Sequence, residues 1–309
     1  VLSVIGFIMT ERRAKQPILS LNFFANKTFS LIIAITLLYG AAFLGAILYL
    51  TQFNQQVFGA SAEEAGYMLL PMMAGMMTAS VSIGQIISRV GRYKRFILVG
   101  FTLTTIGIGS LITLTPTSPY WHEAIIMLFV GLGLGTSMPI LTLAVQNEFK
   151  QKDLGAATSS VQLFRGLGST IGTAVLSGVL TVGIMQSIGK PSRLDYIQTL
   201  KDSPSTSRYL DDELTADSLL QINSQSSVIK TQAEQAIRQS SVSAQSAEAK
   251  IDEFSKLQSD YSRQVVDAFT ESLHRIFLIS SLLMLVGLAL ATQLPDRELR
   301  KSSDETSGL

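Results

Sequence analysis

The chain has 309 residues, of which 47% are hydrophobic and 15% are charged, and its formal net charge is +1. A mean hydropathy of +0.35 moves it toward the composition of membrane proteins. The small net charge argues against a nucleic-acid-binding protein, which needs an excess of basic residues to neutralise phosphates. The chain has no cysteine, which excludes disulfides, thiolate nucleophiles and cysteine-ligated metal sites.

The first apolar stretch, Val1–Met9, is too short to cross a bilayer. We interpret it as the end of a membrane span that starts before residue 1, and we expect the chain to be the C-terminal part of a larger protein. Residues 1–29 would then be the end of that span followed by a cytoplasmic linker.

Six further segments are each about 20 residues or longer, the length that covers a ~30 Å hydrocarbon core at 1.5 Å per residue. None of them holds an Asp or Glu, whereas a soluble protein would place charge on one face of such helices. We therefore predict an all-α integral membrane protein, with five membrane helices in residues 30–184 and a last one in residues 272–294. The segments lie near Leu31–Leu50, Tyr67–Ile87, Phe96–Leu114, Ala124–Val145, Thr158–Ile184 and Ile276–Leu294.

The basic residues of the connections predict the orientation. Every second short connection is rich in Lys and Arg, and the connections between them, Thr51–Gly66 and Thr115–Glu123, have none. Because basic residues in short loops stay on the cytoplasmic side, the tail at residues 295–309 is expected to be cytoplasmic. We expect a multi-pass protein of the cytoplasmic (inner) membrane of a bacterium.

One connection, residues 185–271, is long and polar, and by alternation it lies outside the cytoplasm. Long loops translocate largely regardless of their charge. Ile251, Phe254, Tyr261 and Val265 recur at helical spacing, which predicts a helical hairpin or a long helix leading into the last span. We expect a partly disordered stretch near Lys190–Asp217. The segment is either a solvated spacer or a docking surface for a periplasmic partner protein.

The short loop after the second span combines glycines with basic residues. Glycines let two helices turn tightly, and the arginines can meet helix C-termini and carboxylates of a neighbouring bundle. The pattern resembles the loop signature of the major facilitator superfamily, G-x-x-x-D-R-x-G-R-R/K, with Ser88 in place of the usual acidic residue. The resemblance implies a cytoplasmic gating loop; a cluster that only sets orientation is the alternative. The residues that carry it are Gly84, Arg89, Gly91, Arg92, Lys94 and Arg95.

The fourth and fifth spans indicate which subfamily of the superfamily this chain resembles. The fourth carries Gly131-Leu132-Gly133-Leu134-Gly135 and Pro139, and the fifth carries Gln162, Arg165 and repeated glycines. This succession is similar to the fourteen-helix drug:proton antiporters of the EmrB/QacA type. Membership implies that this chain supplies the C-terminal six-helix bundle, with a long extracytoplasmic loop between the last two helices.

Two pairs of glycines have small-xxx-small spacing, which allows close helix packing: Gly131 with Gly135, and Gly168 with Gly172. Pro139 removes one helical hydrogen bond and can start a bend. We expect helix packing from all five residues and a transport-linked bend as a further role. A dinucleotide site is excluded because no strand precedes the glycines.

Arg165 is the main candidate for a functional residue, because a charge placed mid-bilayer costs roughly 2.5–3.5 kcal/mol. Gln162 lies one turn earlier. Both either line or latch the cytoplasmic half of a central cavity, or Arg165 extends to the cytoplasmic interface. Gln146 and Asn147, at the cytoplasmic end of the fourth span, are weaker candidates for the same cavity or gate.

Together these patterns predict proton-driven export of lipophilic or cationic compounds by alternating access between two six-helix halves. The expected partners are the lipid bilayer, the N-terminal half, the transported compounds and protons. No catalytic residue, metal site or cofactor is predicted. With no carboxylate or histidine within the predicted spans, the proton-coupling acids are expected in the other half. A facilitator of sugars, peptides or metabolites, and a non-transporting scaffold or sensor that uses the outer loop, are the alternatives.

Overall fold

A computed structural model describes residues 21–210, 213–240 and 243–299, so Val1–Met9 and the end of the tail lie outside the described residues. In these ranges the backbone is helical, and β pairing is limited to one isolated bridge between Arg92 and Glu298. The elements are η1 (Leu21–Ala25), α2 (Lys27–Val57), α3 (Ala62–Met68), α4 (Leu70–Val90), α5 (Lys94–Ser110), η2 (Leu111–Thr113), α6 (Tyr120–Glu148), η3 (Gln151–Asp153), α7 (Leu154–Ile188), η4 (Pro191–Arg193), α8 (Asp195–Asp202), η5 (Ser207–Tyr209), α9 (Ala216–Ser224), α10 (Ser226–Ser240) and α11 (Ala244–Thr292).

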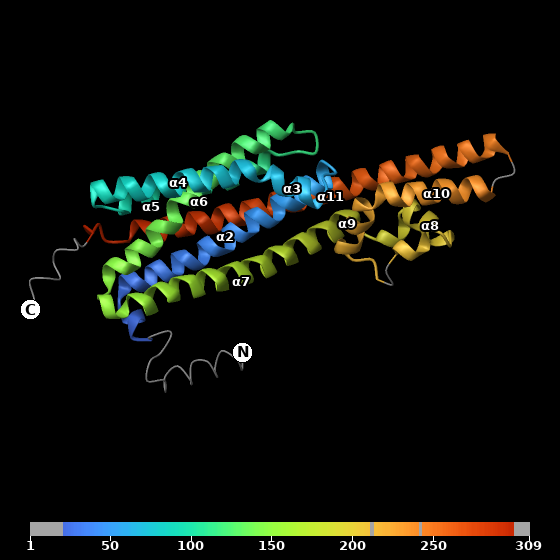
Figure 1. Cartoon of the computed structure of the whole chain (residues 1–309). Helices are drawn as coiled ribbons and strands as arrows, with labels where there is room; N and C mark the ends of the chain where they lie inside the picture. Colours follow the sequence, from blue (N-terminus) through green and yellow to red (C-terminus); the bar gives the residue numbers. More distant parts are fainter. Residues whose placement is uncertain (1–20, 211–212, 241–242, 300–309) are drawn as a thin grey trace, which may run out of the picture.

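Six helices of the described part are long and apolar enough to cross a membrane, which confirms the predicted fold class. They are α2, α4 with the short α3 before it, α5, α6, α7 and α11 (Figure 1). The main packing pairs are α4 with α6, α2 with α7 and α5 with α6, and α11 closes the bundle against α5, α2 and α7. Each membrane helix therefore contacts helices that are distant in the sequence.

Glycines set the closest contact between α6 and α4. A Cβ on Gly131 of α6 would overlap the backbone carbonyl of Met72 on α4, and one on Gly135 would overlap that of Met76. In lipid, where apolar side chains gain nothing from leaving water, such close packing is a main source of helix association. The two helices can approach this far only because neither glycine has a side chain.

A second pair of glycines sets the contact between α7 and α2. Gly168 of α7 lies directly against the backbone of Leu37 on α2. Gly172, one turn later, is buried against Ala41 of α2, and an added Cβ there would overlap both Cα and Cβ of that alanine. The two small-xxx-small pairs of the sequence thus lie in two separate helix seams. This placement supports the packing role, and the transport-linked bend stays a prediction.

Side-chain hydroxyls complete the backbone hydrogen bonding inside the bundle. Pro139 lies within α6 and has no N–H to donate to the carbonyl of Gly135. Ser80 Oγ of α4 donates to that carbonyl at 2.9 Å instead. Likewise Ser169 Oγ of α7 donates to the carbonyl of Gly40 on α2 at 2.9 Å. These bonds satisfy polar groups that lipid cannot solvate.

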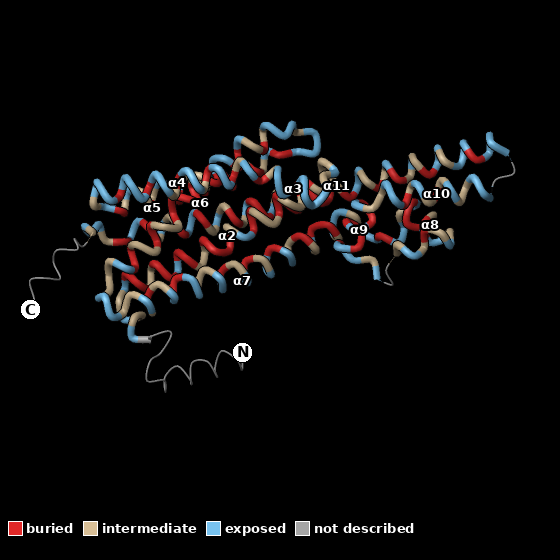
Figure 2. Tube along the Cα trace, in the orientation of Figure 1, coloured by how far each residue is buried: buried red, intermediate tan, exposed pale blue. Residues whose placement is uncertain are grey.

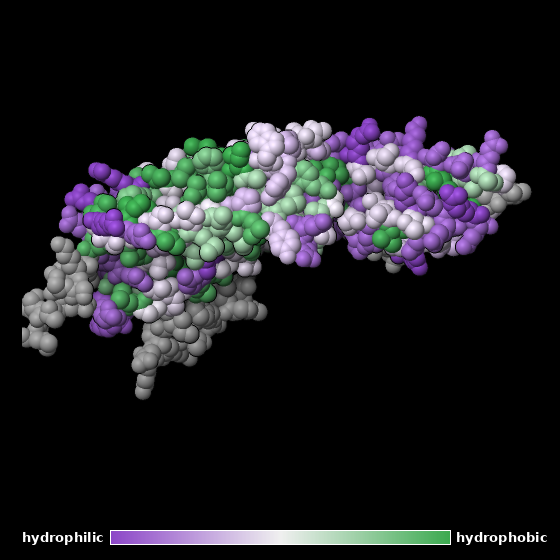
Figure 3. Space-filling view, turned by 45° about the horizontal axis from the view of Figure 1, so that its top comes forward, coloured by the Kyte–Doolittle hydropathy of each residue, from purple (hydrophilic) through white to green (hydrophobic). Residues whose placement is uncertain are grey.

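The last helix is too long for the membrane alone. α11 has 49 residues, which at 1.5 Å per residue is about 74 Å, more than twice a ~30 Å hydrocarbon core. It runs without interruption through the predicted boundary at residue 272, and its N-terminal half packs against α10 and α8. We call α8, α9, α10 and α11 up to residue 270 the polar helical domain; in Figure 3 it is the largely hydrophilic region beyond the apolar bundle.

The polar helical domain has its own core, visible as the buried stretches of its inner faces in Figure 2. The rings of Tyr196 and Tyr261 lie 4.9 Å apart between centroids, and Gln258 Nε2 donates to Tyr196 Oη at 3.0 Å. Burial raises the pKa of Tyr196 to about 12, so the phenol stays neutral at physiological pH. Where the sequence predicted a partly disordered stretch near Lys190–Asp217, the structure has η4, α8 and η5, since Tyr196 and its neighbours pack into this core.

Replacing Gly168 with Ala is expected to lower the free energy of unfolding by about 1–3 kcal/mol, because the added methyl group forces α7 away from α2. Thermal unfolding of the detergent-solubilised protein measures it. Gly178→Ala on the same helix is the matched control, since a Cβ there meets no atom within 4 Å. It should leave stability unchanged or raise it by up to about 1 kcal/mol. Equal effects of the two substitutions would contradict the close-packing interpretation.

Candidate functional site

Arg165 lies in α7 about 16 Å along the helix axis from Leu154. Its side chain is half-buried, and its Nη1 lies 3.3 Å from Met138 Sδ on α6. A thioether is a weak acceptor, and none of the ion pairs among the described residues involves Arg165. Among the described residues this thioether is therefore the one side chain that accepts a hydrogen bond from Arg165.

The exposed surface of α7 divides into two stripes. One stripe is apolar and suits contact with lipid; it comprises Leu163, Leu167, Ile171, Val175 and Val182. The other consists of small or polar residues at four-residue steps and begins at the predicted Gln162; it comprises Gln162, Gly166, Thr170 and Ala174. Lipid does not favour such residues, so this second stripe is suited to a protein or aqueous neighbour.

The same division recurs on α4. Its apolar stripe contains Met73, Met77, Val81 and Val90. Its small or polar stripe contains Ala74, Thr78, Ser82 and Gln85, with Arg89 at its end. The membrane windows of α4 and α7 are each only 28% buried, the lowest share among the six helices. These two helices therefore present the surfaces that the bundle leaves free. The polar stripes were not predicted, because the sequence alone does not show which face of each span is buried.

The loop between α4 and α5 is joined to the chain's own tail. Gly91 ends α4 in the left-handed conformation, with φ of 72°, which glycine adopts without steric cost. Its carbonyl accepts from the N–H of Leu299 at 2.9 Å. Arg92 pairs with Glu298 at 3.0 Å and with Asp296 at 3.8 Å. We call this arrangement of Gly91 and Arg92 with residues 296–299 the tail clasp.

A buried carboxylate extends the tail clasp to two more helices. Glu148, at the end of α6, has a side chain that is only 2% exposed and lies 2.9 Å from Nη1 of Arg297. It also accepts from Asn26 Nδ2 at 3.2 Å, and Asn26 caps the start of α2. The predicted Asn147 donates to the carbonyl of Glu298 at 3.1 Å. Glu148 and Asn26 were not predicted, because no local pattern indicates that the tail returns to them.

The other predicted residues of this end do not gather at one point. Arg89 and Arg95 are exposed, and among the described residues neither they nor Lys94 forms an ion pair. Gly84 lies within α4 with open space at its Cβ position. Gln146 is exposed at the end of α6. The carboxylates that Arg92 meets belong to its own tail, where the sequence had predicted a neighbouring bundle.

Glu123 lies in a helix of membrane length and not in the loop that the sequence predicted. The sequence placed it in a loop, but α6 begins at Tyr120, so Glu123 lies in the first helical turn and is 0% exposed. With its amide nitrogen turned toward the carboxylate, Asn54 of α2 donates to Oε2 at 2.8 Å and to Oε1 at 3.0 Å. Burying an ionised group costs several kcal/mol. A helix N-terminus stabilises a nearby negative charge by up to about 2 kcal/mol, and a hydrogen bond to a charged group contributes about 1.5–3 kcal/mol. These opposing terms are of similar size.

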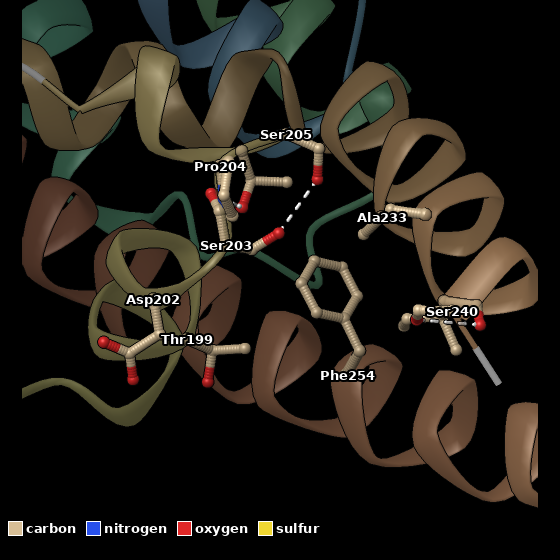
Figure 4. Close-up of a pocket in the computed structure, with 11 residues that line it drawn as sticks. Thr199, Asp202, Ser203, Pro204, Ser205, Ala233, Ser240 and Phe254 are labelled. Atoms are coloured by element: carbon tan, nitrogen blue, oxygen red, sulfur yellow. Dashed lines mark hydrogen bonds between the residues drawn. The ribbon is translucent and has the colours of Figure 1, made fainter.

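The polar helical domain encloses a cavity of about 440 Å³ between α8, the turn after it, α10 and α11. Figure 4 shows the ring of Phe254 projecting toward Ser203 and Ala233, with the hydroxyls of Ser203 and Ser205 joined by a hydrogen bond of 2.9 Å. Asp202 is the one charged residue of its lining. In the described part of the chain no group of three or more His, Cys, Asp or Glu residues could hold a metal ion.

A sequence profile described as the Major Facilitator Superfamily matches residues 6–173. The chain belongs to the major facilitator superfamily. It is thus a multi-pass membrane protein of a transporter family, and the match points to transport and not to catalysis.

The chain is 36% identical over 179 residues to the multidrug transporter protein MdtP of Bacillus subtilis, a match that covers 58% of this chain and 33% of the relative. It is 30% identical over 177 residues to multidrug resistance protein 3 of the same organism, covering 57% of the chain and 34% of the relative. A tetracycline resistance determinant of Streptomyces rimosus is 28% identical over 212 residues, with coverage of 66% and 61%. The chain thus spans about a third of the length of the first two relatives.

Glu148→Gln is expected to lower the free energy of unfolding by about 1–3 kcal/mol, because Arg297 and Asn26 lose a charged acceptor that is buried. Glu298→Gln is the comparison, since that side chain is 76% exposed and such a pair is worth at most about 1 kcal/mol. Chemical unfolding in detergent measures both. An effect of Glu298→Gln as large as that of Glu148→Gln would contradict the role assigned to the buried carboxylate.

Proposed function

We propose that this chain is the C-terminal half of a fourteen-helix, proton-driven multidrug exporter that works by alternating access. The observation that carries the proposal is the pair of small or polar stripes on α4 and α7, which a lipid-facing bundle does not need. A second six-helix half would cover them, and the transported compound would bind near the midplane between the halves. The resistance functions in the names of the relatives support export as the direction of transport.

In this proposal Arg165 and Gln162 lie on the transport surface of α7. Arg165 has only a weak thioether partner, and its charge is too costly to expose to lipid. It therefore binds an acidic or polar group of the other half, or orients a transported compound. The apolar and methionine-rich face of α4 supplies an adaptable surface for lipophilic compounds.

The tail clasp is proposed to lie on the cytoplasmic side of a bacterial inner membrane, as the distribution of basic loops predicts. The polar helical domain then projects on the opposite side. Its compact core supports a role as a rigid docking element for a periplasmic partner protein, because a mere spacer does not need buried tyrosines and phenylalanines.

Proton coupling is proposed to involve carboxylates of the other half. The predicted spans hold no acidic residue, which favours coupling acids in the other half, and the buried Glu123 is an acidic residue of this half that also lies away from water. A carrier of another solute would share the same bundle, so the transported compound must be tested directly.

In the full-length protein, Arg165→Ala is expected to reduce the initial rate of ethidium export on the order of tenfold, because about 1.4 kcal/mol of differential binding corresponds to that factor. Export is measured by fluorescence in cells that lack other efflux pumps, with expression checked by immunoblot. Lys152→Ala, which removes an exposed charge near the start of α7, should export normally. Normal export by well-expressed Arg165→Ala would contradict the proposed transport surface, and no export by the unmodified protein would contradict the proposed function.

The absence of cysteine permits a topology test. A cysteine introduced at the exposed Ser259 of the polar helical domain should react with a membrane-impermeant maleimide in intact cells. A cysteine at the exposed Lys150 should react only after the membrane is opened. The reverse pattern would place the tail clasp outside the cytoplasm and overturn the proposed orientation.

A further inference from the structure

We propose that Glu123 and Asn54 form a proton-binding site at the end of the bundle opposite the tail clasp, where α6 begins and α2 ends. The inference deepens the proposed function, on which it rests for its role in transport, by naming a coupling carboxylate within this chain. The binding of the proton itself depends only on the geometry of the two residues.

Both residues are fully buried, each with 0% exposure. One amide atom of Asn54 lies within hydrogen-bonding distance of both carboxylate oxygens, at 2.8 Å and 3.0 Å. The backbone fixes Asn54 in place, because its carbonyl accepts from the N–H groups of Phe58 and Ala60 at 3.2 Å each. Glu123 is fixed by the first turn of α6. The pair therefore joins two helices at one polar contact.

The contact suits either protonation state of the acid. When Glu123 is ionised, the Asn54 amide nitrogen donates to its two oxygens. When Glu123 is protonated, the amide turns over and its carbonyl oxygen accepts the new O–H in the same position. Asparagine has a donor and an acceptor at the two ends of its amide group, so a hydrogen bond between the two residues can be kept in either protonation state.

No cation neutralises Glu123 among the described residues. On α6 its titratable neighbours are Tyr120 and His122, and the ring of His122 contacts Thr113. Tyr49 lies on α2, and the α3 residues Glu63, Glu64 and Tyr67 are exposed. Asp217, in the first turn of α9, acts electrostatically on Tyr49. On α11, His274 bonds to the carbonyl of Leu114, and Arg275 pairs with Glu271 at 2.7 Å.

The helices that pack around α6 add no further charge. Residues 70–84 of α4, 100–113 of α5 and 171–188 of α7 contain no titratable side chain. A lone buried carboxylate of this kind favours the uptake of a proton, while the helix N-terminus and Asn54 favour its release. The balance of these effects is what a reversible proton site needs.

Water can reach the neighbourhood of the pair. A polar cavity of about 560 Å³ begins one residue beyond Asn54, and its lining includes Gln55, Gln56, Asn223 and Ser262. Asn223 Nδ2 donates to Gln56 Oε1 at 3.0 Å, so the cavity lies where the polar helical domain meets the end of α2. Its lining does not include Asn54 or Glu123, so the cavity brings water close to the pair without opening onto it.

The test is infrared difference spectroscopy of the full-length protein in lipid nanodiscs while the pH is raised from mildly acidic to alkaline. The unmodified protein should show a carbonyl band of a buried carboxylic acid that disappears on deprotonation and that is missing from the spectrum of Glu123→Gln. Glu63→Gln, which removes an exposed carboxylate of α3, should keep it. Asn54→Ala should shift both the frequency of the band and the pH at which it disappears, an effect that a change in folding alone would not produce.

A Glu123 carboxyl that stays ionised at every pH, or one that stays protonated at every pH, would overturn the proposal. The titration needs no transported compound, so its outcome is separate from that of the export assay. If the site titrates, Glu123→Gln should also remove the dependence of ethidium export on the proton gradient. Export by that variant with unchanged proton dependence would show that the site binds protons without driving transport and would overturn its role in coupling.

Discussion

Close contact between helix backbones is the constraint on which this structure depends. In lipid, apolar side chains do not gain free energy by leaving water, so helices associate through packing and hydrogen bonds. Gly131 brings the backbone of α6 into contact with that of α4, and Gly168 brings the backbone of α7 into contact with that of α2. Within these seams Ser80 donates to the carbonyl of Gly135 and Ser169 donates to that of Gly40. The bundle, its free surfaces and the placement of Arg165 all follow from these two seams.

The sequence was informative where the signal is local. Length and apolarity predicted all six membrane helices, because each span must satisfy the bilayer by itself. The burial of Glu148 could not be predicted, since it depends on Arg297, which lies 149 positions away in the sequence. The sequence placed Glu123 in a loop, because a charged residue next to an apolar run normally marks the end of a membrane span. In the structure Glu123 is buried in the first turn of α6, where Asn54 is its polar partner.

The two ends of the bundle differ in how they handle charge. At the tail clasp, Glu148 is matched by Arg297 and Asn26, and the carboxylates of the tail are matched by Arg92. At the opposite end, Glu123 has an amide and, among the described residues, no cation. Within a superfamily of transporters, a matched network is suited to holding helices together and an unmatched carboxylate to a change of state. The two ends of the bundle therefore differ chemically: charges are paired at the tail clasp, and a carboxylate without a cation among the described residues lies at the opposite end.

The uninterrupted α11 also has a mechanical consequence. One helix of 49 residues is at once a bundle member and a support of the polar helical domain. A helix has no joint where motion can be absorbed unless proline, glycine or a bulge supplies one, and residues 244–286 contain neither proline nor glycine. With roughly 40 Å of it beyond the bundle, a tilt of about 10° at the membrane would sweep its far tip sideways by about 7 Å. If the bundle rocks as proposed, α11 would carry that tilt to the far end of the polar helical domain.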